Sequence, residues 1–227
     1  MISLIDADLV AYRVAATCNT DEEGALEIAL LRCDKLMRDI CEATDSVGYR
    51  AFLTGKNNFR KKINPEYKAN RKNIIPPIYL QQCRNYLIEN WNAEVTEGYE
   101  ADDALGMAQD IVGIYDETYN YTGGYTTIIS SLDKDLDMIP GLHYNWKDGL
   151  LYEINEVEAL RNFYKQLLIG DRADNIIGVA GIGKIKAAKL IDPLEYEEDM
   201  YKVVSSLYDD KKRLCLNMEC LWIWRSE

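Results

Sequence analysis

The sequence has little histidine and no paired cysteines. It contains one histidine, His143, and none of its six cysteines forms a Cys-x-x-Cys pair. A zinc site built from cysteine and histidine is therefore not expected. The cysteines are scattered through apolar periodic segments, which fits reduced core thiols in a cytosol.

Long hydrophobic runs are also missing. No stretch reaches the roughly 18 apolar residues of a membrane span. The segment Met1–Asp6 has neither the basic region nor the long apolar stretch of a signal peptide. We therefore expect a cytoplasmic protein with no membrane partner. The length of 227 residues allows one large domain, or a domain with a small appendage.

The charge is unevenly distributed. The net charge of −12 argues by itself against a polyanionic partner such as DNA. Between Gly55 and Lys72, however, the only anion is Glu66, and the cations are Lys56, Arg60, Lys61, Lys62, Lys68, Arg71 and Lys72. This basic stretch is a candidate for binding phosphates. The acidic residues between Asp192 and Asp210 are interpreted as a solvated helical face and its loop.

Patterns of strands and helices alternate along the first two thirds of the chain. Apolar runs predict strands at 2–5, 49–53, 93–96 and 125–131. Helices are predicted over 22–41, from Pro76-Pro77 to about Trp91, and from about Ala101. This alternation predicts an α/β fold with a mostly parallel central sheet flanked by helices, in which ligands gather at the carboxyl ends of the strands. From about Asn155 the pattern becomes wholly helical, so we predict a sheet domain over 1–154 and a helical subregion over 155–227.

Acidic residues follow a strand or open a helix at four places. They are Asp6 with Asp8, Glu100 with Asp102 and Asp103, Asp133 with Asp135, and Asp171 with Asp174. Clustered carboxylates repel one another and raise their pKa values unless a cation neutralises them, so the grouping predicts metal. Oxygen donors suit Mg²⁺ or Mn²⁺, and this many could hold two ions about 3.5–4 Å apart, as in phosphodiester cleavage. Asp8 is interpreted as a helix cap rather than a ligand.

Two further segments indicate nucleic-acid binding. In Gly178-Val-Ala-Gly181-Ile-Gly183, glycines form a tight turn before an amphipathic helix, where backbone amides could meet a DNA phosphate. Lys184, Lys186 and Lys189 add positive charge there. In the basic stretch, aromatic residues interleave with cations, which suits stacking on bases beside phosphates. The alternatives are a plain helix-hairpin turn and an ordinary basic loop.

Taken together, these motifs resemble the flap endonuclease or 5′-3′ exonuclease family of phage and bacterial polymerase-associated nucleases. The resemblance runs from about Ile2 to Leu190. It is carried by the strand ending in Asp6, Phe59-Arg60, Pro65-Glu-Tyr-Lys-Ala-Asn-Arg71, Glu100-Ala-Asp-Asp103, Ser131-Leu-Asp-Lys-Asp-Leu136 and Gly170-Asp-Arg-Ala-Asp-Asn-Ile176.

The resemblance implies a PIN-like sheet domain with a basic helical arch at about 55–75. It also implies a helix-three-turn-helix element, with its helix-hairpin-helix-like motif at about 170–190. The implied activity is that of a structure-specific 5′-nuclease, an exonuclease or flap endonuclease of DNA replication or repair. Its implied partners are DNA with 5′ ends or flaps, an RNA–DNA hybrid and a DNA polymerase. The expected protein is a monomer in the cytoplasm of a bacterium or of a phage host.

The resemblance also assigns roles to individual residues. By motif position, the first metal would be held by Asp6, Glu100, Asp102 and Asp103, and the second by Asp133, Asp135, Asp171 and Asp174. Lys68 and Arg71 would grip the scissile phosphate, with Tyr67 stacking beside them and Arg60 also binding DNA. Backbone carbonyls of Val179, Gly181 and Ile182 would bind K⁺.

One departure from the family pattern leaves other functions open. The family usually has another aspartate after the second strand, where this chain has Thr54 or Gly55. A catalytically weak DNA-binding replication-accessory module is therefore one alternative. A haloacid-dehalogenase-like phosphatase, suggested by Asp6-Ala-Asp8-Leu-Val10, is another, but it leaves the other motifs unexplained.

Overall fold

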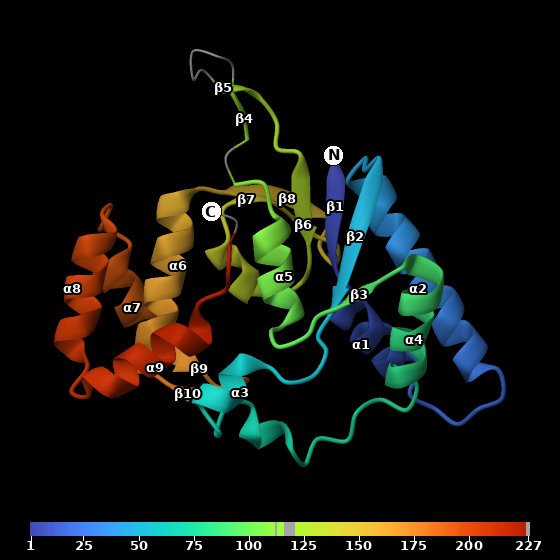
Figure 1. The fold of residues 1–227 in the computed structure, drawn as a ribbon, viewed down its shortest axis with the longest axis horizontal. Helices are drawn as coiled ribbons and strands as arrows, with labels where there is room; N and C mark the ends of the chain where they lie inside the picture. The colour runs from blue at the N-terminus through green and yellow to red at the C-terminus, as the bar shows by residue number, and fades with distance from the viewer. Residues whose placement is uncertain (112, 116–120, 226–227) are drawn as a thin grey trace.

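A six-stranded sheet forms the centre of the protein, as seen in a computed structural model that describes residues 1–111, 113–115 and 121–225 (Figure 1). Its strands are β1 (Ile2–Asp6), β2 (Gly48–Leu53), β3 (Glu94–Val95), β6 (Thr127–Ser130), β7 (Gly141–Asn145) and β8 (Leu150–Ile154). Their order is β3-β2-β1-β6-β7-β8, and only β8 runs antiparallel to its neighbour. The carboxyl ends of the parallel strands therefore share one edge, at the bottom of Figure 1.

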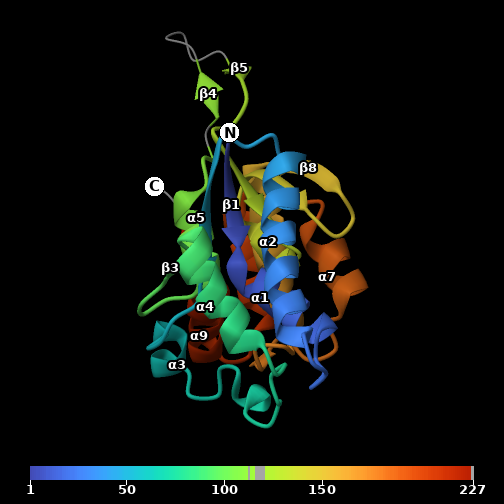
Figure 2. The same ribbon diagram turned by 90° about the vertical axis from the view of Figure 1, so that its right-hand side faces the viewer.

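Helices cover both faces of this sheet. They are α1 (Ala7–Thr17), α2 (Ala25–Ala43), α4 (Leu80–Trp91) and α5 (Ala101–Ala108). Successive strand residues point to opposite faces, so Ile5 packs with α1, α2 and α4 while Leu4 packs with α5. Figure 2 shows α1, α2 and α4 together on one side and α5 on the other. The layers leave the lower sheet edge open for a site.

The second part of the chain packs its own core beside the sheet. It contains α6 (Glu156–Ile169), α7 (Lys184–Ile191), α8 (Glu197–Leu207) and α9 (Lys211–Leu221). Asn155 and Glu158 form a capping box that starts α6 directly after β8. Tyr67 and Met138, from the preceding part of the chain, join this helical core. A division of the chain at residue 154 stays a prediction.

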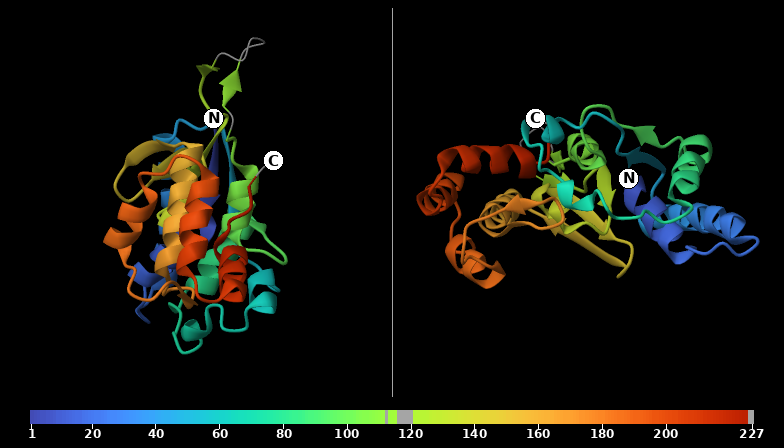
Figure 3. Two further views of the ribbon diagram at one scale, coloured as in Figure 1. Left: turned by 90° about the vertical axis from the view of Figure 1, so that its left-hand side faces the viewer. Right: turned by 90° about the horizontal axis from the view of Figure 1, so that it is seen from below.

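Short elements complete the structure. They are α3 (Phe59–Ile63), the 3₁₀ helices η1 (Ala69–Arg71) and η2 (Lys134–Met138), and the hairpins β4 (Ile114–Tyr115) with β5 (Tyr121–Gly123) and β9 (Gly170–Asp171) with β10 (Ile176–Ile177). Helices α7 and α9 lie on opposite sides of α6 (Figure 3). None of the helices in the described ranges is long and apolar enough to span a membrane.

The predicted α/β fold with a mostly parallel sheet flanked by helices is confirmed. The prediction of a wholly helical chain after Asn155 is wrong, because β9 and β10 form a hairpin between α6 and α7. The helix predicted from Pro76-Pro77 begins later, at Leu80. The predicted helical arch is helical only in α3 and η1, and the chain from Lys72 to Tyr79 crosses to α4 without a helix.

Candidate metal centre and nucleic-acid interface

The first carboxylate is fixed where β1 meets α1. Asp6 caps α1, since its Oδ1 accepts a hydrogen bond from the amide of Leu9 at 3.1 Å. Its Oδ2 accepts from the hydroxyl of Ser131 at 2.8 Å, which ties β1 to the loop after β6. Asp6 is only 2% exposed. This is a rigid, largely desolvated position at the sheet edge.

The N-terminus of α5 brings Glu100 and Asp102 to the same edge. Glu100 is the N-cap residue and is buried, and Asp102 follows in the first turn. The field of a helix N-terminus favours such anions. Glu100 and Asp102 therefore lie at the start of α5, and the charge of Asp6 acts on Asp102. That these residues share a metal ion stays a prediction.

Asp103 points elsewhere, into the protein. Both of its oxygens accept hydrogen bonds from the guanidinium of Arg60, at 2.5 and 2.8 Å, and the side chain is 0% exposed. Its Oδ2 also accepts from the amide of Glu100, which closes the first turn of α5. The prediction of Asp103 as a metal ligand is corrected by this geometry, because both oxygens are already engaged by a buried cation.

Arg60 is likewise a structural residue. Its side chain is 2% exposed, and it also donates to the backbone carbonyls of Cys220 and Trp222. The prediction that Arg60 binds DNA is corrected, because its donors are used inside the protein. The bidentate pair with Asp103 instead holds α3, α5 and the end of α9 together.

The remaining four carboxylates come from the start of η2 and from the β9–β10 hairpin. Asp133 follows β6 and accepts a hydrogen bond from the amide of Asp135 at 2.9 Å. Asp171 lies in β9 and accepts from the amides of Ala173 and Asp174. The side chain of Gln166 on α6 bridges these two elements, because it donates to Asp135 at 3.0 Å and contacts Asp171 at 3.5 Å.

Burial and neighbouring negative charges raise the pKa values of Asp6 and Asp102 in the first group. Burial raises the pKa of Asp6 to about 7, with further contributions from the charges of Asp8 and Asp133. Burial and the charges of Asp6, Asp133 and Glu100 raise the pKa of Asp102. The charge of Asp133 thus raises the pKa values of both Asp6 and Asp102.

Burial and neighbouring negative charges also act on the carboxylates of η2 and the β9–β10 hairpin. Burial and the charges of Asp133, Asp171 and Asp174 raise the pKa of Asp135 to about 8. The structure therefore brings seven of the predicted ligands into one electrostatic neighbourhood: Asp6, Glu100, Asp102, Asp133, Asp135, Asp171 and Asp174.

A basic segment, residues 66–71, lies against this neighbourhood. The amine of Lys68 donates to Glu100 at 2.5 Å and lies 3.6 Å from Asp174. Arg71 donates to Asp174 at 2.7 Å and to the carbonyl of Ala173 at 2.9 Å. Although burial lowers the pKa of Lys68, the charges of Glu100 and Asp174 raise it overall, so the amine stays charged. Lys68 and Arg71 therefore lie beside the carboxylates of Glu100 and Asp174. Their contact with a scissile phosphate stays a prediction.

Tyr67 has a different position from the one predicted. It is 3% exposed, and its hydroxyl contacts Glu100 at 2.8 Å and Asp174 at 2.6 Å. The prediction that Tyr67 stacks on DNA is corrected, because the ring lies in the helical core. Tyr67 instead holds two candidate ligands that come from distant parts of the chain.

The glycine turn leads into α7 as predicted. Lys184, Lys186 and Lys189 are exposed on this helix, and no ion pair is found for them within residues 1–111, 113–115 and 121–225. Gly181 has a φ of 74°, which favours glycine. Ile182 donates its amide to the carbonyl of Val179 at 3.2 Å. The K⁺ site at these carbonyls stays a prediction.

Asp8 and Thr54 form a side network that the sequence did not reveal. Asp8 pairs with Arg84 of α4 and accepts from the amide of Thr54 at 2.8 Å. The interpretation of Asp8 as a helix cap is therefore wrong, because Asp6 caps α1 instead. The hydroxyl of Thr54 accepts from the amide of Ala101 at 3.0 Å, so position 54 faces the start of α5.

The chemistry of the donors fits divalent metal. All are carboxylate oxygens, and five of them have raised pKa values because burial and mutual repulsion disfavour their charges. Among the described residues, however, no three His, Cys, Asp or Glu side chains are arranged to hold a metal ion. Lys68 and Arg71 occupy two of the carboxylates in this arrangement.

Known proteins with similar sequences are bacterial and phage nucleases and polymerases. No protein-family model matches the chain. It is 29% identical over 230 residues to DNA polymerase I of Bacillus caldotenax, covering 92% of this chain but 25% of the polymerase. It is 25% identical over 243 residues to a 5′-3′ exonuclease of Mycoplasma genitalium, covering 95% of this chain and 80% of that protein. The chain therefore spans about a quarter of the polymerase and most of the exonuclease.

A solved structure shares the fold. The flap endonuclease of bacteriophage T5, crystallised as a pseudo-enzyme-product complex with DNA and metal ions, has a TM-score of 0.67 at 18% identity. The match covers 97% of this chain and 89% of that one. The resemblance to the flap endonuclease and 5′-3′ exonuclease family, predicted from the motifs, is thereby confirmed.

Proposed function

We propose that the protein is a metal-dependent, structure-specific 5′-nuclease that hydrolyses DNA phosphodiester bonds at or near 5′ ends and flaps, in replication or repair. One observation carries the proposal: the carboxylates of four segments act on one another's ionisation, and Lys68 and Arg71 form ion pairs with Glu100 and Asp174 among them. The relatives named as exonucleases and flap endonucleases support the same activity.

The metal ligands are divided between two ions. Asp6, Glu100 and Asp102 would hold the first, and Asp135, Asp171 and Asp174 the second, with Asp133 between the two groups. When bound, two ions supply an activated water and stabilise the leaving oxygen. Ser131, Gln166 and Tyr67 orient the carboxylates through the hydrogen bonds described above. We take the ions to be Mg²⁺, with Mn²⁺ as a substitute.

Two groups of cations would contact different parts of the DNA. Lys68 and Arg71 would contact the scissile phosphate, because they are the cations that already reach the carboxylate cluster. Lys184, Lys186 and Lys189 on α7 would hold the duplex backbone, and the carbonyls of Val179, Gly181 and Ile182 would bind K⁺ at the same turn.

The substrate and partners follow from the same site. DNA with 5′ ends or flaps is the main substrate, with an RNA–DNA hybrid as a secondary one. The similarity to part of DNA polymerase I supports a DNA polymerase as functional partner. The nuclease itself would act as a monomer.

The two alternative functions have less support. A phosphatase of the haloacid-dehalogenase type would need a free Asp8, but Asp8 is paired with Arg84 and with the amide of Thr54. A catalytically weak accessory module was suggested by Thr54, which stands where the family has an aspartate. Without Asp103, however, seven predicted metal ligands remain in one electrostatic neighbourhood. The phosphatase predicts no cleavage of DNA, and the accessory module predicts weak cleavage.

Cleavage assays test the proposal directly. Flap, nicked and blunt DNA duplexes and an RNA–DNA hybrid, each with a 5′ label, are incubated with Mg²⁺, Mn²⁺ or EDTA, and product sizes are compared. We expect metal-dependent products near the 5′ end. Asp133→Ala should abolish cleavage while binding to the flap duplex survives, and Asp148→Ala, in the exposed turn after β7, is the matched control. Unchanged turnover of Asp133→Ala would refute the assignment of the metal ligands.

A further inference from the structure

Two amide side chains on one face of α6 join this helix to η2. Asn162 donates to the backbone carbonyl of Asp137 at 2.9 Å, and Gln166, about one turn later, donates to the carboxylate of Asp135 at 3.0 Å. Residues four apart lie on the same face of a helix. The two contacts differ in kind, because Asn162 reaches only the backbone of η2 whereas Gln166 reaches a candidate metal ligand.

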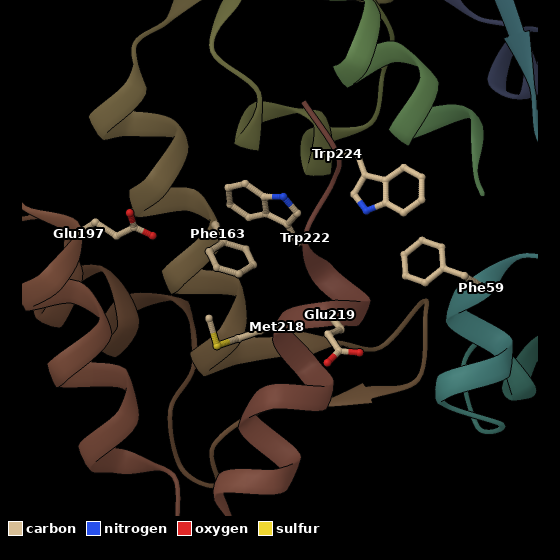
Figure 4. Close-up of a pocket in the computed structure, with 7 residues that line it drawn as sticks. All are labelled: Phe59, Phe163, Glu197, Met218, Glu219, Trp222 and Trp224. Atoms are coloured by element: carbon tan, nitrogen blue, oxygen red, sulfur yellow. The ribbon is translucent and has the colours of Figure 1, made fainter. Parts of the chain in front are cut away.

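The core side of α6 fixes the direction of this amide face. Phe163 and Leu167 each follow one of the amide residues, so they lie about 100° further around the helix. Both are buried in the helical core. Phe163 meets Trp222 edge to face, at 4.9 Å between ring centroids and 82° between planes, and Figure 4 shows its ring pointing from α6 towards that indole. Rotation of α6 about its axis would break this packing, so Gln166 stays directed towards η2.

Gln166 also stands where α6 ends and the β9–β10 hairpin begins. Its backbone carbonyl accepts a hydrogen bond from the amide of Gly170. Gly170 has a φ of 76°, and a Cβ at this position would lie 2.4 Å from the amide nitrogen of Gly178, so the turn requires glycine. The turn brings the carboxylate of Asp171 to 3.5 Å from the side-chain nitrogen of Gln166. One amide nitrogen therefore faces two carboxylates from different elements.

Asp135 and Asp171 are held without a protein cation. Lys68 and Arg71 pair with other carboxylates, and within residues 1–111, 113–115 and 121–225 no lysine or arginine forms an ion pair with Asp135 or Asp171. Burial is the largest cause of the raised pKa of Asp135, and the charge of Asp171 adds to it. Two carboxylates that repel each other move apart unless a donor holds both. A primary amide has two N–H donors and no charge, so Gln166 suits this task.

A neutral donor in this position favours metal binding. Each carboxylate oxygen keeps a lone pair besides the one that accepts from the amide. Outer hydrogen-bond partners orient carboxylates that bind a metal, and loss of such a partner typically lowers metal affinity about 10–100-fold. A lysine would instead place a fixed positive charge between the two carboxylates. The amide of Gln166 therefore orients Asp135 and Asp171 without competing with an ion for them.

We propose that Gln166 is the positioning residue that controls whether the second metal site is occupied. The inference rests on the proposed two-metal function and deepens it, because it makes the second ion separable from the first. In the described part of the chain, the hydrogen bonds of the Gln166 side chain go to Asp135 and Asp171, both of the second group. Substitutions at position 166 should therefore change the binding of one ion and leave the other.

Counting bound Mn²⁺ tests this inference without turnover. The full chain is titrated with Mn²⁺ in the absence of DNA, and free Mn²⁺ is measured by electron paramagnetic resonance. Gln166→Leu removes the amide, and Gln166→Lys replaces it with a fixed cation. Asn162→Leu is the matched control, because it removes the other amide that joins α6 to η2 but that touches no candidate ligand. Melting temperatures report the structural cost of each substitution.

We expect the unsubstituted chain to bind two Mn²⁺ ions. In Gln166→Leu, one of the two dissociation constants should rise about 10–100-fold while the other stays unchanged. Gln166→Lys should bind a single ion. Asn162→Leu should bind both ions with unchanged affinity, even if its melting temperature falls as far as that of Gln166→Leu.

Three results would overturn the inference: unchanged binding of both ions by Gln166→Leu, equal weakening of both ions, or the same weakening by Asn162→Leu. The last would show that Gln166 acts only through the docking of α6 on η2. An unsubstituted chain that binds one ion and still cleaves the flap substrate would also overturn it, while the nuclease function would stand. Loss of one of two ions in Gln166→Leu, in a protein that cleaves no DNA, would support the role of Gln166 and refute the nuclease.

Discussion

Arg60 and Asp103 form a charged pair inside the protein, directly behind the candidate metal ligands. Taking both charges out of water is costly, and the cost is offset only while each retains its partner. The pair therefore stabilises the native arrangement mainly through the penalty for losing either member. A structural role and a metal-binding role for Asp103 make opposite predictions, which a single substitution separates.

Asp103→Ala should lower the free energy of unfolding by about 3–5 kcal/mol, because it leaves the buried guanidinium of Arg60 with only Glu100, at 3.7 Å, as a counter-ion. Urea denaturation followed by circular dichroism measures the change. Arg50→Ala removes the exposed pair between Arg50 and Glu94 and should cost less than about 1 kcal/mol. If Asp103→Ala keeps its stability but loses affinity for metal, Asp103 is a ligand after all.

Thr54→Asp tests the departure from the family pattern. The hydroxyl of Thr54 bonds the amide of Ala101, next to Asp102, so an aspartate there would add a charge beside the first metal. We expect the Mg²⁺ dependence of cleavage to shift to lower concentration, because Mg²⁺ would replace a water with a carboxylate. Metal titrations of both proteins on one flap substrate measure the midpoints. An unchanged or higher Mg²⁺ midpoint would mean that the side chain at position 54 does not contribute to metal binding.

The sequence predicted some residue roles and could not predict others. Asp6 and Asp133 were placed at the sheet edge because each follows a parallel strand. The sequence expectation failed for Asp171, which lies in the hairpin after α6. The roles of Arg60 and Tyr67 were missed, because a basic, aromatic segment looks the same whether its side chains face DNA or the core. Only their distant partners decide this, and Cys220 lies 160 residues away from Arg60. Gln166 carries no sequence signal for its bridge to Asp135 and Asp171.

At the scale of elements, the basic segment 66–71 and helix α7 differ in what their cations touch. The segment is joined to the loop after β9 by the amide of Lys68, which donates to the carbonyl of Asp174 at 2.9 Å, and by Asn70 and Arg71. The lysines of α7 face solvent. The first set should therefore act on turnover and the second on affinity.

Lys68→Ala or Arg71→Ala should lower turnover on the order of 10²–10³-fold, as for loss of one electrostatic donor in a transition state. Lys184→Ala should weaken duplex binding and reduce its salt dependence by roughly one charge. Single-turnover cleavage at saturating DNA and binding at several salt concentrations separate the two effects. Equal slowing by Lys184→Ala and Lys68→Ala at saturating DNA would contradict this division.

The strands β1, β2, β3 and β6 were predicted from the sequence, and β7 and β8 were not. In β6 all four residues are buried, and Ile128 and Ile129 supply the apolar signal. In β8, Leu150 and Leu151 are exposed, at 56% and 51%, so apolar residues there do not mark the buried face. The turn Asn145-Trp-Lys-Asp-Gly149 was the available signal for the β7–β8 hairpin, since Gly149 has a positive φ.

At the scale of the whole molecule, the carboxylate cluster makes stability depend on pH and metal. Asp6 and Asp135 have pKa values raised to about 7 and about 8, so the folded state holds their protons more tightly than the unfolded chain. Their ionisation therefore opposes folding, and stability without metal should fall as pH rises from about 4 to about 8. A divalent cation that binds the ionised groups should reverse this loss.

We therefore expect Mg²⁺ to raise the melting temperature more at pH 8 than at pH 5.5, relative to EDTA. Asp135→Asn should raise the melting temperature in EDTA at pH 8 and flatten its pH dependence, by at most about 1.4 kcal/mol per pH unit for one group. Thermal unfolding followed by circular dichroism measures both. Asp148→Asn, an exposed site in the turn before β8, should change neither. Equal Mg²⁺ effects at both pH values would show that the cluster is not strained by its own charge.

The contacts of Arg60 also order events during synthesis of the chain. Its guanidinium donates to the carbonyls of Cys220 and Trp222, and the amide of Trp224 donates to Asp103. A ribosome that has translated the sheet and every proposed metal ligand has still not made these partners. Until residue 224 has left the exit tunnel, Arg60 and Asp103 lack these hydrogen-bond partners, directly behind the candidate metal ligands. The nuclease centre should therefore be assembled last, after translation has passed α9.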